Sequence, residues 1–210
     1  MKKLWIIIPF LIILTIFCIN FSIQDINQDN HDKPVGEIRK GNVVGQTFIS
    51  NYNGLCAVDV CLATYIRTNT EDIIFHLRPD PKAKEDIITI VVNARNIEDN
   101  KYHRFNFNPI ENSKGKSYYF FIESPKSVPG NAITAWYNTK DAYGNGSAYI
   151  NHEEIEGDIQ FKTYYETDFF DVVAYFCGRA SRDKPFFVFY FSLVVILIFL
   201  LVKSSFPREK

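Results

Sequence analysis

The stretch Ser117-Tyr118-Tyr119-Phe120-Phe121-Ile122-Glu123 decides how this chain folds. Side chains alternate between the two faces of an extended strand, so Tyr118, Phe120 and Ile122 share one face and the residues between them share the other. Both faces are largely apolar or aromatic, and at least one of them must be buried in a core. The stretch therefore predicts a β-strand in the interior of a β-rich domain.

Runs of the same kind recur on both sides of this strand. They cover residues 43–49, 55–65, 73–77, 87–92, 103–107, 117–123, 133–137, 147–150 and 159–165. Turn-forming residues separate nearly every pair, as in Pro79-Asp80-Pro81 and Gly144-Asn145-Gly146. About eight or nine closely spaced strands with no helical pattern between them predict an all-β fold, a jelly-roll β-sandwich over residues 43–166.

Two apolar segments flank this region. Residues 4–21 and 185–202 contain no charged side chain and are each close to the length that crosses a hydrocarbon layer about 30 Å thick. Transmembrane helices are therefore predicted over residues 1–22 and 185–202. A polar stalk, residues 23–42, and a juxtamembrane helix or linker, residues 167–184, would join them to the sandwich. A cleaved signal peptide is the alternative for the first segment.

The flanking basic residues predict the orientation. Lys2 and Lys3 precede the first segment, while Lys203, Arg208 and Lys210 lie in the tail formed by residues 203–210. Basic residues are retained on the cytoplasmic side, so both termini are expected there. This interpretation makes the chain a double-pass cell-membrane protein that contacts lipid at both ends and displays its central domain outside the cytoplasm.

Composition and motifs limit the possible functions. The formal net charge of -1 generates no field that would attract nucleic acid. The sequence has no nucleophile, metal-protease or phosphate-loop motif, so a non-catalytic protein without a cofactor is expected. Cys56 and Cys61 should point to opposite faces of one strand, which disfavours a disulfide between them. No metal site is predicted, with a structural calcium ion at Asp158 as the weak alternative.

Binding is easier to support, because flat aromatic rings pack against sugar rings while amides, carboxylates and arginine bind the hydroxyl groups. The candidate ligand-binding residues are Trp136, Tyr137, Tyr143, Tyr149, Arg67, Asn69, Asp99 and Asn100. Among them Tyr143, beside Gly144, is expected to be the most exposed. Trp136 is the candidate for which a core position competes most strongly with a ligand contact.

Several short segments carry a family resemblance. They are residues 44–48 (VGQTF), 63–69 (ATYIRTN), 97–100 (IEDN), 105–110 (FNFNPI), 113–120 (SKGKSYYF) and 157–165 (GDIQFKTYY). Over about residues 43–165 the chain resembles jelly-roll, carbohydrate-binding-like modules of prokaryotic surface and membrane proteins. Some of these accompany membrane proteins of the glycosyltransferase type. The resemblance implies a fold and no catalytic residue.

The sequence thus predicts a membrane-anchored, extracytoplasmic binding module for a glycan or cell-surface polymer. The alternative is an accessory subunit of a membrane complex that works through protein contacts. An exposed concave aromatic patch would favour the first function, and a flatter apolar patch would favour the second.

Overall fold

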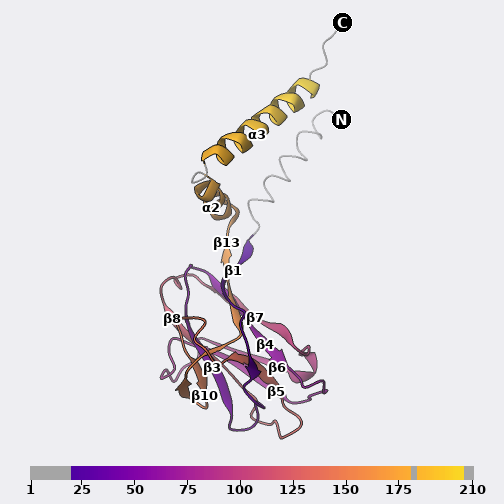
Figure 1. Cartoon of the computed structure of the whole chain (residues 1–210), viewed down its shortest axis with the longest axis vertical. Coiled ribbons are helices and arrows are strands. Elements are labelled where there is room, and N and C mark those ends of the chain that lie inside the picture. The colour runs from indigo at the N-terminus through magenta and orange to yellow at the C-terminus, as the bar shows by residue number, and fades with distance from the viewer. Residues whose placement is uncertain (1–19, 181–183, 206–210) are drawn as a thin grey trace. The chain divides into compact units, whose positions relative to one another are not determined.

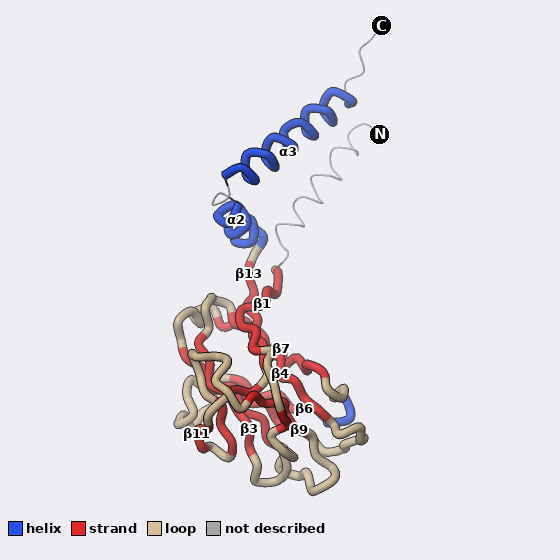
Figure 2. The backbone as a smooth tube through the Cα atoms, viewed as in Figure 1, coloured by secondary structure: helices blue, strands red, loops and turns tan. Residues whose placement is uncertain are grey.

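The computed structural model describes residues 20–180 and 184–205 (Figure 1). The chain divides into two compact units, and Ser22–Glu166 forms the larger one. Strands dominate this unit, as the red segments of Figure 2 show. The helices α2 (Phe169–Ala180) and α3 (Lys184–Ser205) belong to the other unit. The β-rich unit carries all the candidate binding residues.

Two antiparallel sheets build the β-rich unit in a sandwich-like arrangement. The seven-stranded sheet has the order β1 (Phe21–Gln28), β13 (Phe161–Thr167), β4 (Leu55–Ala63), β9 (Thr134–Asn138) and β12 (Asp158–Ile159), with β2 (Lys33–Pro34) on β9 and β7 (Lys101–Ile110) on β4. The six-stranded sheet has the order β11 (Glu153–Ile155), β10 (Ala148–Ile150), β3 (Val43–Ile49), β8 (Ser117–Glu123), β5 (Asp72–Arg78) and β6 (Ile88–Asn93). A short 3-10 helix, η1 (Ala94–Asn96), follows β6.

The strand that decides the fold lies inside the six-stranded sheet and is buried on both faces. Phe120 and Ile122 of β8 belong to the main core, where Phe120 stacks on Phe75 with ring centroids 5.9 Å apart. Tyr119 and Phe121, on the opposite face, form a smaller cluster with Val43 and the half-buried Tyr149. Burial of both faces explains why the sequence of β8 is almost continuously apolar.

Most strand predictions are confirmed. The runs at residues 43–49 and 117–123 coincide with β3 and β8, and the others overlap observed strands. The segment expected to be an irregular stalk instead contains β1 and β2. β1 was not predicted because most of its residues are polar. Most of these polar side chains face solvent, while Ile26 lies in the core.

The expectation of flanking transmembrane helices is corrected. Across residues 20–180 and 184–205, no helix combines the length and apolar character that a membrane crossing requires. A crossing takes about 20 consecutive apolar residues, and Lys184 and Lys203 bound the apolar run within α3. The first expected span falls outside the described residues except at its last positions. The double-pass topology and the membrane localisation inferred from these spans are corrected with them.

Candidate binding loop

The loop at residues 64–69, which joins β4 to β5, is held in place by a carboxylate. Oδ1 of Asp99 accepts hydrogen bonds from the backbone N–H of Thr64, at 2.6 Å, and from the Thr64 hydroxyl, at 2.9 Å. The backbone hydrogen bond from Thr64 is the main cause that lowers the pKa of Asp99, with further hydrogen bonds from Ile66 and Tyr65 and in spite of partial burial. The ionised carboxylate thus fixes the first turn of this loop.

The loop holds two consecutive residues in the left-handed region. Tyr65 has a φ of 58° and Ile66 a φ of 59°. This region is unfavourable for a β-branched residue and costs about 1 to 2 kcal/mol. The strained backbone also displays its side chains, since Ile66 is 92% exposed and Tyr65 is 39% exposed. Strain of this kind persists where surrounding contacts impose it, and it concentrates at binding sites.

Arg67 lies against the base of the loop. Its guanidinium carbon is 4.7 Å from the centre of the Tyr65 ring, and Nη2 donates to Oε1 of Glu37 at 2.9 Å and to the carbonyl of Ala132 at 3.1 Å. Nε of Arg67 and Oδ1 of the buried Asn69 have no hydrogen-bond partner within the described part of the chain. Buried polar atoms are usually paired, so two unpaired ones beneath one loop are a local exception, and both are shielded from the surface that a ligand would meet.

Trp136 joins the same loop end through Asn100. Its Nε1–H donates to Oδ1 of Asn100 at 2.9 Å, and Nδ2 of Asn100 donates to Oδ2 of Asp99 at the same distance. The indole is half-buried and lies outside the main core, with the exposed His31 ring 4.8 Å away by centroids. Trp136, Asn100, Asp99 and Thr64 thus form one connected chain of hydrogen bonds. We call residues 64–69, together with His31, Glu37, Asp99, Asn100 and Trp136, the loop end.

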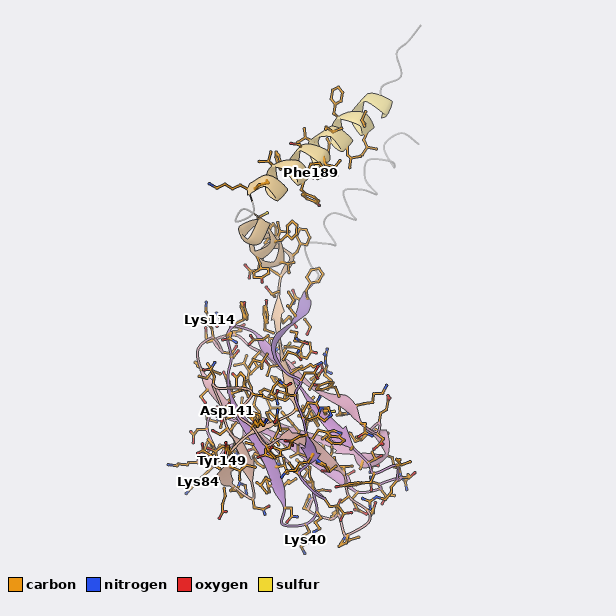
Figure 3. All side chains as sticks on the ribbon, in the orientation of Figure 1. Lys40, Lys84, Lys114, Asp141, Tyr149 and Phe189 are labelled. Carbon is orange, nitrogen blue, oxygen red and sulfur yellow. The ribbon has the colours of Figure 1, made fainter. Side chains whose placement is uncertain are left out.

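The structure brings five of the eight predicted residues together at the loop end and places the other three elsewhere. Tyr137 is buried in the core, and its hydroxyl donates to the carbonyl of Glu156. Tyr149 packs edge-on against Tyr119 at 5.2 Å, with its hydroxyl donating to Glu154 at 3.3 Å. Figure 3 labels Tyr149 in the β-rich unit.

Tyr143, expected to be the most exposed candidate, is half-buried. Its ring meets Phe161 edge-on at 5.5 Å, and its hydroxyl accepts a hydrogen bond from the N–H of Ile49 at 3.2 Å. Desolvation is the main cause that raises the pKa of Tyr143. Gly144 led to the prediction of an exposed turn. The Tyr143 ring instead packs against Phe161, a contact that the sequence around Tyr143 does not indicate.

Asp158, the candidate calcium ligand, is fully buried and its carboxylate is surrounded by donors. Oδ1 accepts from Nε2 of Gln46 at 2.9 Å. Oδ2 accepts from the backbone N–H groups of Ala142 and Tyr143, at 2.7 and 2.8 Å. Three N–H groups surround this carboxylate, an arrangement that suits an anion and leaves little oxygen for a cation. No cluster of metal-ligating side chains occurs among the residues that the structure describes.

Two further polar clusters lie on the outer faces of the sheets. On the seven-stranded sheet, Arg104 binds both oxygens of Asp59, at 2.7 and 2.9 Å. On the six-stranded sheet, Asp86 accepts hydrogen bonds from Arg78, at 2.5 Å, and from Thr89, and it lies 2.6 Å from Nδ1 of His76. Their charged groups are paired with one another, so these clusters stabilise strand packing.

Sequence reasoning missed Tyr65 and Ile66 as members of the loop end. The strand predicted over residues 55–65 is largely apolar and takes in Tyr65, and Ile66 follows it directly. Nothing in an Ile side chain signals a left-handed backbone, which arises here from the hydrogen bonds of Asp99. His31 and Glu37 are about 30 residues or more away in sequence from the residues that they contact, Trp136 and Arg67. Local sequence patterns therefore could not predict either contact.

Comparison with known proteins assigns no family. No protein-family model matches the chain, and no curated protein is significantly similar to it. The resemblance to jelly-roll, carbohydrate-binding-like modules therefore stays a prediction. The two-sheet architecture and the loop end provide the evidence for function.

Proposed function

We propose that this chain is a non-catalytic binding module that recognises a glycan through the loop end. One observation carries the proposal: the Asp99 carboxylate holds Tyr65 and Ile66 in a strained conformation that projects both side chains outward. Strain is retained when other contacts impose it, and a displayed aromatic and aliphatic pair is a feature that a ligand can use.

The chemistry of the loop end suits a sugar. The rings of Tyr65 and Trp136 offer flat apolar faces for the C–H groups of a pyranose. The partly exposed guanidinium of Arg67 and the exposed amide of Asn100 supply polar groups for hydroxyl groups. A small number of polar groups beside aromatic surface is the usual composition of a small-molecule site.

The carboxylates of the loop end support binding in preference to hydrolysis. A glycosidase needs two acidic side chains that are free to exchange protons with the substrate. Asp99 is engaged by Thr64 and Asn100, and Oε1 of Glu37 accepts from Arg67 and from the N–H of Gly130. Both acids hold the loop in position, which supports a non-catalytic role.

A glycan array probed with the full-length chain tests the proposal. Tyr65→Ala should weaken binding to the best glycan at least about tenfold, a typical loss for an aromatic contact at a binding site. Tyr52→Ala is the matched control, since Tyr52 has the same 39% exposure and stacks on Tyr165 away from the loop end. Absence of any glycan binding, or equal losses in both variants, would contradict the proposal.

Protein contact through the same surface is the second candidate, and the exposure of Ile66 favours it. An aliphatic side chain that is 92% exposed on a rigid loop resembles an anchor for a hydrophobic pocket. A photo-reactive residue placed at position 66 of the full-length chain should then capture one protein from the native cell. The same residue at Ile49, which is 36% exposed and pairs with Ser117 at the other end of the six-stranded sheet, should capture none.

A further inference from the structure

We propose that Asn145 is a deamidation site, at which water slowly converts the folded chain to aspartate and isoaspartate forms. The chain contains two Asn-Gly pairs, Asn53-Gly54 and Asn145-Gly146. Asparagine is a chemically labile residue, and a following glycine has no Cβ to keep its backbone nitrogen away from the asparagine side chain. The fold treats the two pairs differently, because it holds one firmly and the other loosely.

Asn145 lies exposed in the loop at residues 139–147, which joins β9 to β10. Its side-chain amide makes no hydrogen bond with any other residue that the structure describes. The N–H of Gly146 donates to the carbonyl of Tyr143 at 3.3 Å, which is longer than the usual separation of about 3.0 Å. Only this one long hydrogen bond has to open before the Gly146 nitrogen can approach the side chain of Asn145.

Asn53 is also exposed, but the groups that would react there are engaged. Its Oδ1 accepts from the backbone N–H of Lys114 at 3.0 Å, and the N–H of Gly54 donates to the carbonyl of Ile110 at 3.0 Å. Gly54 is buried, and its carbonyl accepts from the N–H of Glu166 at 2.8 Å. This part of the chain must open locally before it can react, so the fold protects Asn53.

The reaction at Asn145 consumes only water. The Gly146 nitrogen gives its proton to hydroxide and forms a bond to Cγ of Asn145. The bond from Cγ to Nδ2 then breaks, and this nitrogen takes a proton from water and leaves as ammonia. Water opens the resulting five-membered imide. Attack at Cγ gives aspartate, whereas attack at the main-chain carbonyl carbon gives isoaspartate, in which the backbone continues through Cγ.

Isoaspartate at position 145 does not fit the folded structure, because it adds one carbon to the backbone. Gly146 lies so close to β3 that a Cβ on it would be 1.9 Å from the carbonyl oxygen of Thr47. Ser147 donates its N–H to Oγ1 of Thr47 at 2.8 Å and accepts from the Thr47 N–H at 3.0 Å. These bonds lead directly into the pairing of β10 with β3. A longer backbone must displace Ser147 and loosen this part of the six-stranded sheet.

Peptide mapping of the full-length chain by mass spectrometry, after incubation at neutral and at mildly alkaline pH, tests the assignment of the site. The peptide with Asn145 should gain the mass difference between NH2 and OH, and should do so faster at the higher pH. Conversion should be at least about tenfold faster than at Asn53, whose hydrogen bonds must open first. In denaturant the two rates should become similar.

Three outcomes would overturn the assignment. They are no mass gain at Asn145 in the folded chain, similar rates at the two sites in the folded chain, and a tenfold difference that persists in denaturant. The last result would mean that the local sequence, and not the fold, separates the two sites.

Thermal unfolding of aged protein tests the structural consequence. The wild-type fraction that an isoaspartate methyltransferase labels should unfold at least about 2 °C below the fresh protein, because the contact of Ser147 with Thr47 is lost. Asn145→Gln is the matched control, since a longer amide side chain forms the imide far more slowly, and its midpoint should not change on ageing. Asn145→Asp carries the new charge on a backbone of normal length and should unfold like the fresh wild type. An equal loss in aged Asn145→Gln or in fresh Asn145→Asp would overturn the role given to the lengthened backbone.

Discussion

Two loops of the β-rich unit are each held by one aspartate, and they differ in where they send their side chains. Asp158 is fully buried and binds the backbone of Ala142 and Tyr143, so the Tyr143 ring packs inward on Phe161. Asp99 is half-buried and binds the backbone of Thr64, and the loop that follows projects Ile66 into solvent. An aspartate that binds backbone N–H groups thus adds a side chain to the core in one loop and exposes side chains in the other. The two loops differ in how deeply the aspartate is buried.

We call the loop at residues 139–147, which Asp158 holds, the inward loop, and residues 64–69, which Asp99 holds, the outward loop. The largest expected effect on stability is in the inward loop. Asp158→Ala removes the shared acceptor of Gln46 Nε2 and of the backbone N–H groups of Ala142 and Tyr143, and should lower the free energy of unfolding by about 3 to 5 kcal/mol. Chemical denaturation measures this change. Asp141→Ala is the control, because Asp141 lies in the same loop (Figure 3) and is exposed; it should change stability by less than about 0.5 kcal/mol. Equal effects would erase the distinction between the two loops.

The outward loop should respond less in stability and more in binding. Asp99→Ala removes the acceptor for the N–H and hydroxyl of Thr64 and should cost about 1 to 2 kcal/mol. The same variant frees Tyr65 and Ile66 to leave the left-handed region, so glycan binding should fall as far as in Tyr65→Ala. Denaturation and array binding of one protein sample give both quantities. A variant that keeps full binding would show that the strained conformation is dispensable.

The pH dependence of stability distinguishes the ionised from the protonated form of Asp99. Hydrogen bonds, that from the Thr64 backbone first, hold the pKa of Asp99 below its ordinary value of 3.8 in the folded chain. The unfolded chain therefore binds the proton first. The stabilisation by Asp99 is present above the ordinary value and is lost as the pH falls through the lower, folded value.

Asp99→Asn should show this as a difference. The stability gap between the wild type and the variant should be constant from pH 7 to about pH 5 and should narrow below about pH 4. Thermal unfolding at several pH values measures the gap. A gap that widens in acid would mean that Asp99 is not stabilised as the anion.

The smallest effect is expected where strain is relieved. Asn tolerates the left-handed region better than Ile does, so Ile66→Asn should leave stability unchanged or raise it by up to about 1 kcal/mol. Replacement of an Ile that is 92% exposed loses almost no core contact. A second measurement, array binding, tells whether Ile66 itself contacts the ligand. A destabilised variant would contradict the assignment of strain to this position.

Local pattern predicted the strands well and the loops poorly. The alternation at residues 117–123 and the turn residues between runs locate β3 and β8 correctly. The signal is clearest for β8, because a strand buried on both faces is almost continuously apolar. The strand β1 was not predicted, since its inward-facing Ile26 lies among residues that are mostly polar. The apolar ends led to an expectation of membrane spans that no helix of the described residues fulfils.

The candidate site was predicted in part for the same reason. Arg67, Asn69, Asp99 and Asn100 belong to turns that the sequence marks with polar residues, and the topology then gathers them with Trp136. Tyr143 and Tyr149 carry equally good aromatic chemistry, but their exposure depends on Phe161 and Tyr119, which lie far away in sequence. Side-chain type can be read from a sequence, whereas exposure follows from tertiary contacts.

Hydrogen exchange of the full-length chain, with and without the glycan that binds most strongly on the array, tests the central claim most directly. Bound glycan should slow exchange at residues 64–69, 99–100 and 136, and should leave residues 138–146 unchanged. Protection at residues 138–146 with none at the loop end would contradict the account, because the ligand would then be recognised by the inward loop.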